Sequence, residues 1–308
     1  MSSIQSKDDI EIRLMEKKHM KEALNCFSVF DLQESLSTLE AFYECDSKAF
    51  YVAINRKDNR VIGACGAPVT THNSGFLGLY VVDSEFQNRG IGKQLFESCL
   101  QNIGNRNCGL HAVPEKLEMY RNKAGFRVSE GISMVVCSGI PMNWQSLRQN
   151  VDKEIKIEVF NRDNNELLQK IIDYDSRVQM NGNREKLINL CLHNSGYTTF
   201  VAINDNTKQL NGFGCIRIDY EGKGMIGPVY GDNEIIGEVL IYNLLKSCPV
   251  TQTKGLLYMT ISSSMTGIEI SKKLELTETE RCERVFTKHV IPVNHSLIYC
   301  LFSPNFGL

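Results

Sequence analysis

The sequence predicts an α/β protein made of two tandem copies of one domain. Residues 75–100 have the pattern of a strand, a polar turn, a glycine-rich loop and a helix. Residues 200–204 and 212–215 repeat the apolar pattern of residues 50–55 and 63–65 at an offset of about 150 residues. The chain has 308 residues, of which 42% are hydrophobic, and this is long for one such domain. We therefore expect a first domain at residues 1–140, a linker at 141–154 and a second domain at 155–308.

In the first copy, a local sequence pattern predicts each strand and helix in turn. Apolar and polar residues alternate at 10–14, as in a half-buried strand, and helical spacing follows at about 19–30 and 35–43. Residues 50–54 and 61–65 form a hairpin over the polar turn 56–59. After residues 75–100 come a strand at 109–113, a helix that Pro114 begins and Gly125 ends, and a closing strand at 133–137.

The second copy repeats this order after the polar run 145–152. Strands are expected at 200–204 and 212–215, and a strand at 227–230 leads into a helix at 234–246 with one apolar face.

The glycine-rich loop predicts an anion site. Gly90 and Gly92 precede a helix whose first backbone N–H groups have no partner within the helix, and these groups favour a phosphate. A Walker loop is excluded because Gln87 and Gln94 stand where it needs glycine and Ser or Thr. A dinucleotide fingerprint is excluded because Leu95 replaces its third glycine. An ordinary glycine turn is the alternative.

The run Gln87-Asn88-Arg89-Gly90-Ile91-Gly92 resembles the Q/R-x-x-G-x-G/A motif of the GCN5-related N-acetyltransferases (GNAT). The strand before it and residues 120–126 after it match the order of that family. The resemblance implies domains with a mixed, mostly antiparallel central sheet flanked by helices, and early helices that border the acceptor pocket. It also implies acetyl-CoA as cofactor, bound by Val81, Val82, Asp83, Gln87, Asn88, Arg89, Gly90, Ile91, Gly92, Lys93 and Lys123. For Lys93 and Lys123 the alternative is that they are solvent-exposed lysines at helix ends that do not contact the cofactor.

The same resemblance assigns the acid for the leaving thiolate to Tyr120, with aromatic packing as the alternative. A tyrosine hydroxyl is neutral at pH 7 and has a basicity close to that of a thiolate. No base is clear: His111 and Glu85 are the nearest titratable groups, and His111 fits a core histidine as well as a water relay. Val113 stands where the family often has asparagine. The sequence therefore does not show which residue would make the cofactor or substrate contacts of that asparagine.

The second copy is expected to be degenerate. Asp232 and Glu234 stand at its phosphate-loop position, where acidic side chains repel a diphosphate. Residues 175–177, 227–230 and 283–286 resemble the C-terminal half of a tandem acetyltransferase. We expect this copy to lie on the acceptor side, with Asp175, Arg177 and Tyr230 as an acceptor wall, since ligand sites often lie between domains.

Composition limits the partners. A net charge of −2 gives no electrostatic reason to expect nucleic acid or an anionic membrane. The start of the chain has no signal-like apolar core, so a soluble, cytoplasmic protein is expected. The 11 cysteines are scattered, as are the six histidines, which favours reduced thiols and no metal site. The oligomeric state stays open.

The function predicted from the sequence is N-acetyl transfer from acetyl-CoA to a primary amine, with a small molecule as first choice. A protein N-terminus or lysine is the alternative acceptor. A non-catalytic acyl-CoA-binding sensor or scaffold is the alternative function: Tyr120 favours the enzyme, and Val113 leaves room for the sensor.

Overall fold

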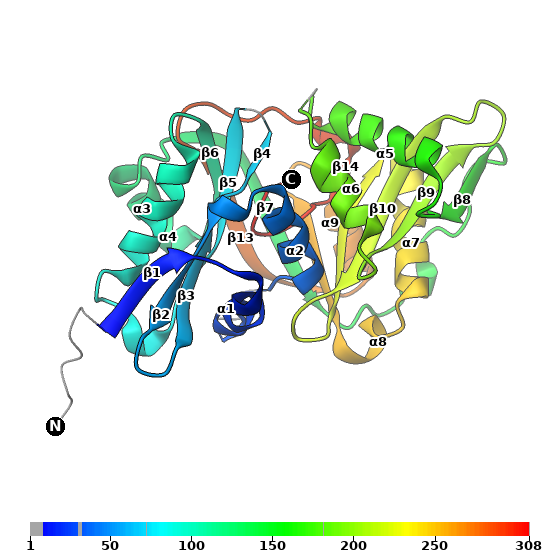
Figure 1. The fold of residues 1–308 in the computed structure, drawn as a ribbon. Helices are drawn as coiled ribbons and strands as arrows, with labels where there is room; N and C mark the ends of the chain where they lie inside the picture. The colour runs from blue at the N-terminus through cyan, green and yellow to red at the C-terminus, as the bar shows by residue number, and fades with distance from the viewer. Residues whose placement is uncertain (1–8, 30–32, 72, 181, 308) are drawn as a thin grey trace.

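A computed structural model describes residues 9–29, 33–71, 73–180 and 182–307. Strands from both halves of the chain form one mixed sheet, with helices on both of its faces (Figure 1). Among the described residues the strand order is β1-β2-β3-β5-β6-β13-β7-β12-β11-β10-β9-β8, with β4 beside β5 and β14 beside β11. The predicted α/β class and the mostly antiparallel pairing are confirmed, because β5–β6 and β11–β12 are the only parallel pairs among the described strands.

The first half forms the elements that local patterns predict, and the end of the helix expected at about 19–30 lies outside the described residues. Its elements are β1 (Ile10–Leu14), α1 (Met20–Ser28), α2 (Leu36–Cys45), β2 (Phe50–Asn55), β3 (Arg60–Gly66), β4 (Val69–Thr71), β5 (Ser74–Val82), α3 (Ile91–Ile103), β6 (Asn107–Ala112), α4 (Pro114–Lys123) and β7 (Val128–Gly139). Ser35 caps α2 by accepting the N–H of Thr38, and Pro114 occupies the first turn of α4. The short strand β4 was not predicted.

The second half repeats the pattern and adds a strand at its end. Its elements are β8 (Ile155–Val159), α5 (Asn165–Val178), α6 (Glu185–His193), β9 (Thr198–Asn204), β10 (Leu210–Ile218), β11 (Gly224–Gly231), α7 (Glu234–Ser247), α8 (Thr251–Lys254), β12 (Leu256–Ile261), α9 (Met265–Lys273), β13 (Thr277–Phe286) and β14 (Ile298–Cys300). None of the described helices is long and apolar enough to cross a membrane.

The two halves exchange strands at the centre of the sheet. β13, from the second half, lies between β6 and β7 of the first half and pairs antiparallel with both. β7 in turn pairs with β12 of the second half. The two predicted domains therefore follow one another along the chain but share one sheet.

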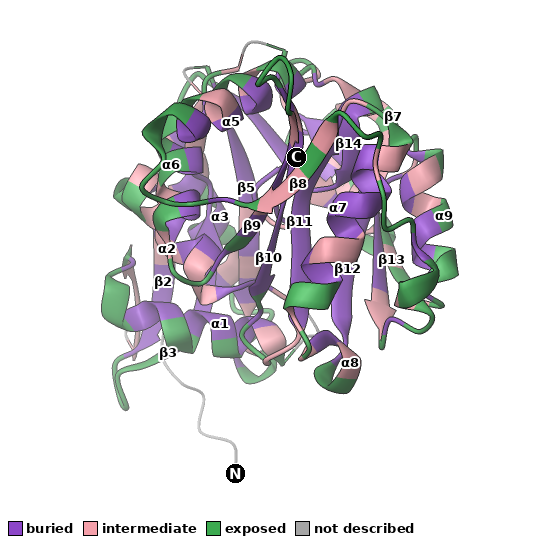
Figure 2. Cartoon of the chain, turned by 90° about the vertical axis from the view of Figure 1, so that its right-hand side faces the viewer, coloured by how far each residue is buried: buried purple, intermediate pink, exposed green. Residues whose placement is uncertain are grey.

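The core is divided by the sheet. One cluster joins α1 and α2 to α5 and α6, and so connects the two halves. A second cluster lies under α3 and α4, and a third under α7 and α9. Figure 2 shows β10, β11 and β12 of the second half buried, β8 at most half-buried, and the outer sides of α6, α8 and α9 exposed. All 11 cysteines are free, and nine of them are buried, as expected for reduced thiols.

Candidate functional site

The strand pairing is interrupted beside the end of β5, and we call this gap between the paired parts of β5 and β6 the slot. The parallel pairing of β5 with β6 ends at Leu77 and Leu110, although both strands continue. Leu79 has a φ of 50°, and the register between β3 and β5 shifts at this point. A bulge of this kind bends a strand and interrupts its pairing. Residues 80–82 therefore have a partner strand on the β3 side only.

The backbone direction in this segment identifies the amide that faces the slot. Asp83 donates its N–H to the carbonyl of Ile62, which precedes Gly63 on β3, at 2.8 Å. Backbone N–H groups point to alternate sides along a strand, so the N–H of Val82 faces the slot and that of Val81 faces β3. Gln87 lies at the mouth of the slot and donates from Nε2 to the carbonyl of Val82 at 2.9 Å.

The predicted phosphate loop has the backbone of an anion site. Asn88 and Gly90 have φ values of 61° and 81°, a left-handed conformation that turns successive N–H groups into a concave surface. Gly90 is the N-cap of α3, and no side chain caps this helix or places an acid in its first turn. The first N–H groups of α3 are thus available to an anion at the positive end of the helix dipole.

The side chains around the loop keep it in place and leave its centre open. Arg89 donates to the carbonyl of Glu85 at 2.8 Å and lies over the ring of Phe86, with 5.1 Å between guanidinium carbon and ring centre. Asp83 accepts the N–H of Glu85 and pairs with Arg60 at 3.1 Å. A Cβ atom added to Gly90 would have no protein atom within 4 Å.

The remaining predicted cofactor residues divide into a buried and an exposed group. Ile91 is buried in the core under α3, and Gly92 contacts Tyr80, because a Cβ there would lie 2.7 Å from the tyrosine hydroxyl. Lys93 and Lys123 are exposed, and Lys93 lies 3.7 Å from Glu97 in a surface ion pair. The solvated alternative remains open for both lysines.

Tyr120 lies in an aromatic cluster between α3 and α4. Its ring centre is 6.2 Å from those of Phe96 and Phe126, and 8% of the residue is exposed. No hydrogen bond joins its hydroxyl to another residue in the described part of the chain. Burial, followed by the nearby Tyr80, raises the pKa of Tyr120 well above its usual range. The hydroxyl is therefore protonated at neutral pH, and burial makes it a weaker acid than the free tyrosine assumed from the sequence.

His111 is held as a neutral ring at the edge of the slot. Its Nδ1 donates to the carbonyl of Pro304 at 2.9 Å, and its Nε2 is inaccessible and has no partner among the described residues. Burial lowers the pKa of His111 to about 4, while the hydrogen bond to Pro304 opposes the shift. Such a histidine cannot serve as a solvent-linked base at neutral pH without rearrangement.

The second copy has no comparable loop. In the first half, residues 84–90 separate Asp83 from α3, whereas Asn233 alone separates Asp232 from α7. Asn233 caps α7 by accepting the N–H of Ile236 at 3.1 Å. Asp232 accepts from Tyr174 at 3.0 Å and from Asn211 at 2.9 Å, and it also pairs with Arg177. The loop is therefore shortened as well as acidic, and Arg177 balances the charge of Asp232.

The expected acceptor wall is not a surface in this structure. Asp175 is 1% exposed and pairs with the buried Arg184, whose Nε lies 3.1 Å from Oδ2 of the aspartate. Tyr230 is fully buried and accepts from Arg184 at 3.4 Å. Only Arg177 reaches solvent, where it binds Asp232. We correct the prediction for Asp175 and Tyr230: both are buried, and Arg184 binds both of them in the interior.

A strand of the chain itself fills the equivalent slot of the second half. The parallel pairing of β11 with β12 ends at Ile226 and Tyr258. Beyond that point β14 pairs with β11, and Leu301 donates its N–H to Met259 of β12 at 2.9 Å. The sequence analysis missed this strand, because three residues carry no recognisable period.

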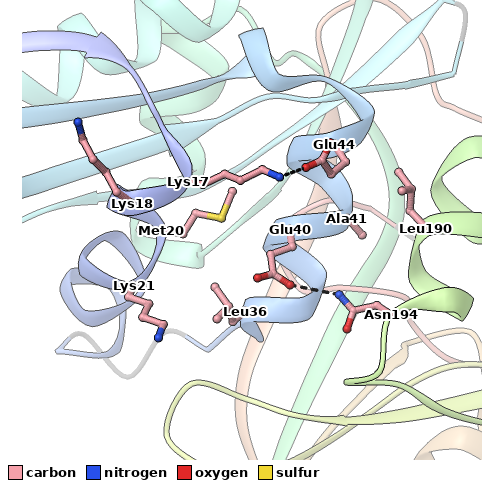
Figure 3. Close-up of a pocket in the computed structure, with 10 residues that line it drawn as sticks. All are labelled: Lys17, Lys18, Met20, Lys21, Leu36, Glu40, Ala41, Glu44, Leu190 and Asn194. Atoms are coloured by element: carbon pink, nitrogen blue, oxygen red, sulfur yellow. Dashed lines mark hydrogen bonds and ion pairs between the residues drawn. The ribbon is translucent and has the colours of Figure 1, made fainter.

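One pocket of the described residues lies away from the slot. It has a volume of about 500 Å³ and opens between α1, α2 and α6 (Figure 3). Lys17 pairs with Glu44 there, and Glu40 accepts from Asn194 at 3.2 Å. This pocket shares no residue with the loop at 87–92.

Comparisons with known proteins agree with this architecture. Residues 17–126 match the Acetyltransferase (GNAT) family and residues 171–300 match the Acetyltransferase (GNAT) domain. A holothin acyltransferase from Pseudoalteromonas is 24% identical over 214 residues, which is 70% of this chain and 67% of that protein.

Two solved structures share the fold over most of the chain. A candidate acetyltransferase from Pyrococcus horikoshii has a TM-score of 0.74 and 16% identity, covering 100% of this chain and 99% of its own. A tandem GNAT protein from the clavulanic acid biosynthesis pathway has a TM-score of 0.62 and 12% identity, with coverage of 90% and 98%. The two family matches and the shared tandem fold show that this chain belongs to the GNAT superfamily of acyltransferases and carries two GNAT domains in tandem.

Proposed function

We propose that the first half binds acyl-CoA, with acetyl-CoA as the first candidate, and transfers the acyl group to the primary amine of a small molecule. The observation that carries the proposal is the combination of an uncapped α3 N-terminus with an open slot beside residues 80–82. A diphosphate fits the first feature and an extended pantetheine chain fits the second, where it would take the place of a missing strand. The acyltransferase relative supports a small-molecule acceptor.

The cofactor would supply an activated thioester, and the residues of this chain would hold and polarise it. The N–H groups at 88–92 would bind the diphosphate, and Gln87 would stay on Val82 at the mouth of the slot. The N–H of Val82 faces the slot, and a fixed donor of this kind can stabilise a developing oxyanion. Tyr120 would provide the proton for the leaving thiolate.

We also propose that the second half binds no coenzyme A. Its slot contains β14, and its helix α7 is capped by its own asparagine. The protein should therefore bind one coenzyme A per chain, which the stoichiometry of a calorimetric titration measures. A stoichiometry of two would contradict this division.

The central experiment is thiol release from acetyl-CoA in the presence of a panel of small primary amines, with mass spectrometry of the products. Longer acyl-CoA donors run in parallel identify the preferred acyl group. We expect release that depends on both protein and amine, with a matching acylated product; reactions without amine measure hydrolysis. Coenzyme A binding without any acylated product would favour the sensor, and absence of binding would refute both functions.

A further inference from the structure

The bulge in β5 turns two successive residues toward the same face of the sheet. Leu77 and Tyr80 pack in the cluster under α3, whereas Leu79 and Val81 pack in the cluster with α1 and α2. Gly78 also faces the α1 and α2 side, because a Cβ added to it would point at Asn305. The slot therefore has an aromatic face toward α3 and a second face at Gly78 and Leu79.

The C-terminal segment covers this second face. A Cβ on Gly78 would lie 2.0 Å from the carbonyl oxygen of Asn305, so the two backbones are in direct contact. Asn305 Oδ1 accepts the N–H of Leu79 at 3.4 Å, and the carbonyl of Pro304 accepts from His111 at 2.9 Å. The segment thus bridges β5 and β6 at the point where their pairing ends.

Buried groups from both halves fix the segment in this position. Glu34 accepts from Ser303 at 2.6 Å and from Asn305 at 3.1 Å. Arg217, fully buried on β10, donates to the carbonyl of Phe302 at 2.8 Å. Phe306 packs against Phe42, with 4.6 Å between ring centres. Because Glu34 and Arg217 are buried, losing their partners would be costly, and the segment is a fixed part of the fold.

We infer that residues 303–306 form the acceptor-side wall of the slot and restrict the first half to compact amines, excluding extended polypeptides. This inference rests on the proposed function. Phe96 and Tyr120 fill the α3 face, β13 covers the free edge of β6, and the wall closes the α2 side at Gly78. An extended polypeptide could not cross the bulge without displacing the wall, whereas a compact amine need only reach the slot.

The test compares two acceptors on the full chain: the most active small amine of the panel and a decapeptide with a free N-terminus and one lysine. Turnover with acetyl-CoA is the first measurement, and acceptor binding to the protein saturated with free coenzyme A is the second. The Gly78→Ala variant should displace the wall, because its Cβ meets only the backbone of Asn305. A chain that ends at Phe302 removes the wall, and combining the two changes completes a double-mutant cycle.

We expect the native chain to prefer the small amine by about a hundredfold or more in kcat/KM and in affinity, since specificity here comes from steric exclusion. Gly78→Ala and the shortened chain should each reduce that preference by about tenfold, and Gly78→Ala should add nothing in the shortened chain. Equal preference for both acceptors in the native chain, or additive effects of the two changes, would overturn the inference. An inactive native chain would count against the proposed function, while the binding ratio would still decide the role of the wall.

Discussion

The replacement of Gly90 by aspartate tests the phosphate loop most directly. Gly90 is exposed, has a φ of 81°, and a Cβ there meets no protein atom within 4 Å, so the new side chain can point to the centre of the loop. Two unit charges 4 Å apart repel by about 1 kcal/mol in water and by about 4 kcal/mol at an effective dielectric constant of 20. For a diphosphate at this exposed position we expect a loss of about 2 kcal/mol, or about thirtyfold in Kd.

Two controls separate charge from shape and backbone strain. Gly90→Asn has nearly the same shape and tolerates the left-handed conformation, so the Asp-to-Asn ratio measures the charge alone. Gly222→Asp puts the same residue at a φ of 89° with no neighbour within 4 Å, in a turn of the second half. Calorimetry with coenzyme A at low and high salt gives the affinities, and the ratio should shrink as salt rises. Equal affinities of the Asp and Asn variants at low salt would refute a diphosphate at this loop.

Three further predictions follow from the same geometry. Tyr120→Phe should lower turnover by about a hundredfold, as general-acid catalysis usually contributes, and should leave the melting temperature and coenzyme A affinity nearly unchanged; unchanged turnover would return Tyr120 to a packing role. Because the pKa of His111 is lowered to about 4, the folded protein should lose stability as pH falls from 6.5 to 4, by up to about 3 kcal/mol; urea unfolding of His111→Asn at pH 7 and 4.5 should show a smaller loss, and an identical loss would refute the assignment. A fragment of residues 1–150 should not fold, because β6 would lose β13 as its partner; a cooperative thermal transition in that fragment would contradict this.

The features predicted well from the sequence are those that depend on local residues. Gly90 and the apolar period of residues 91–103 are neighbours in the chain, so loop and helix could be placed together. The same holds for the strand that ends at Val82 and for Pro114 at the start of α4. Each of these elements is determined by patterns shorter than about fifteen residues.

The features that were missed depend on contacts between distant residues. Nothing in residues 277–286 shows that they pair with β6 and β7, since an alternating strand fits many partners. Asp175 and Tyr230 matched a family pattern, but that pattern does not reveal that Arg184 binds both of them in the interior. The contact between Gly78 and Asn305 joins residues that are far apart in the chain.

The two slots show two ways in which the backbone groups of an unpaired strand segment can find hydrogen-bond partners. A glycine stands at the corresponding place in each copy. Gly78 contacts the carbonyl of Asn305, and a Cβ added to Gly227 would lie 1.9 Å from the carbonyl oxygen of Leu301. Buried backbone N–H and carbonyl groups without partners cost about 1–3 kcal/mol each. In the second half β14 supplies those partners permanently, and the loop before α7 is short and capped. We therefore expect the short, capped loop before α7 and the pairing of β14 with β11 to act together: where the chain itself supplies the partners of β11, an extended ligand has no free backbone groups to pair with.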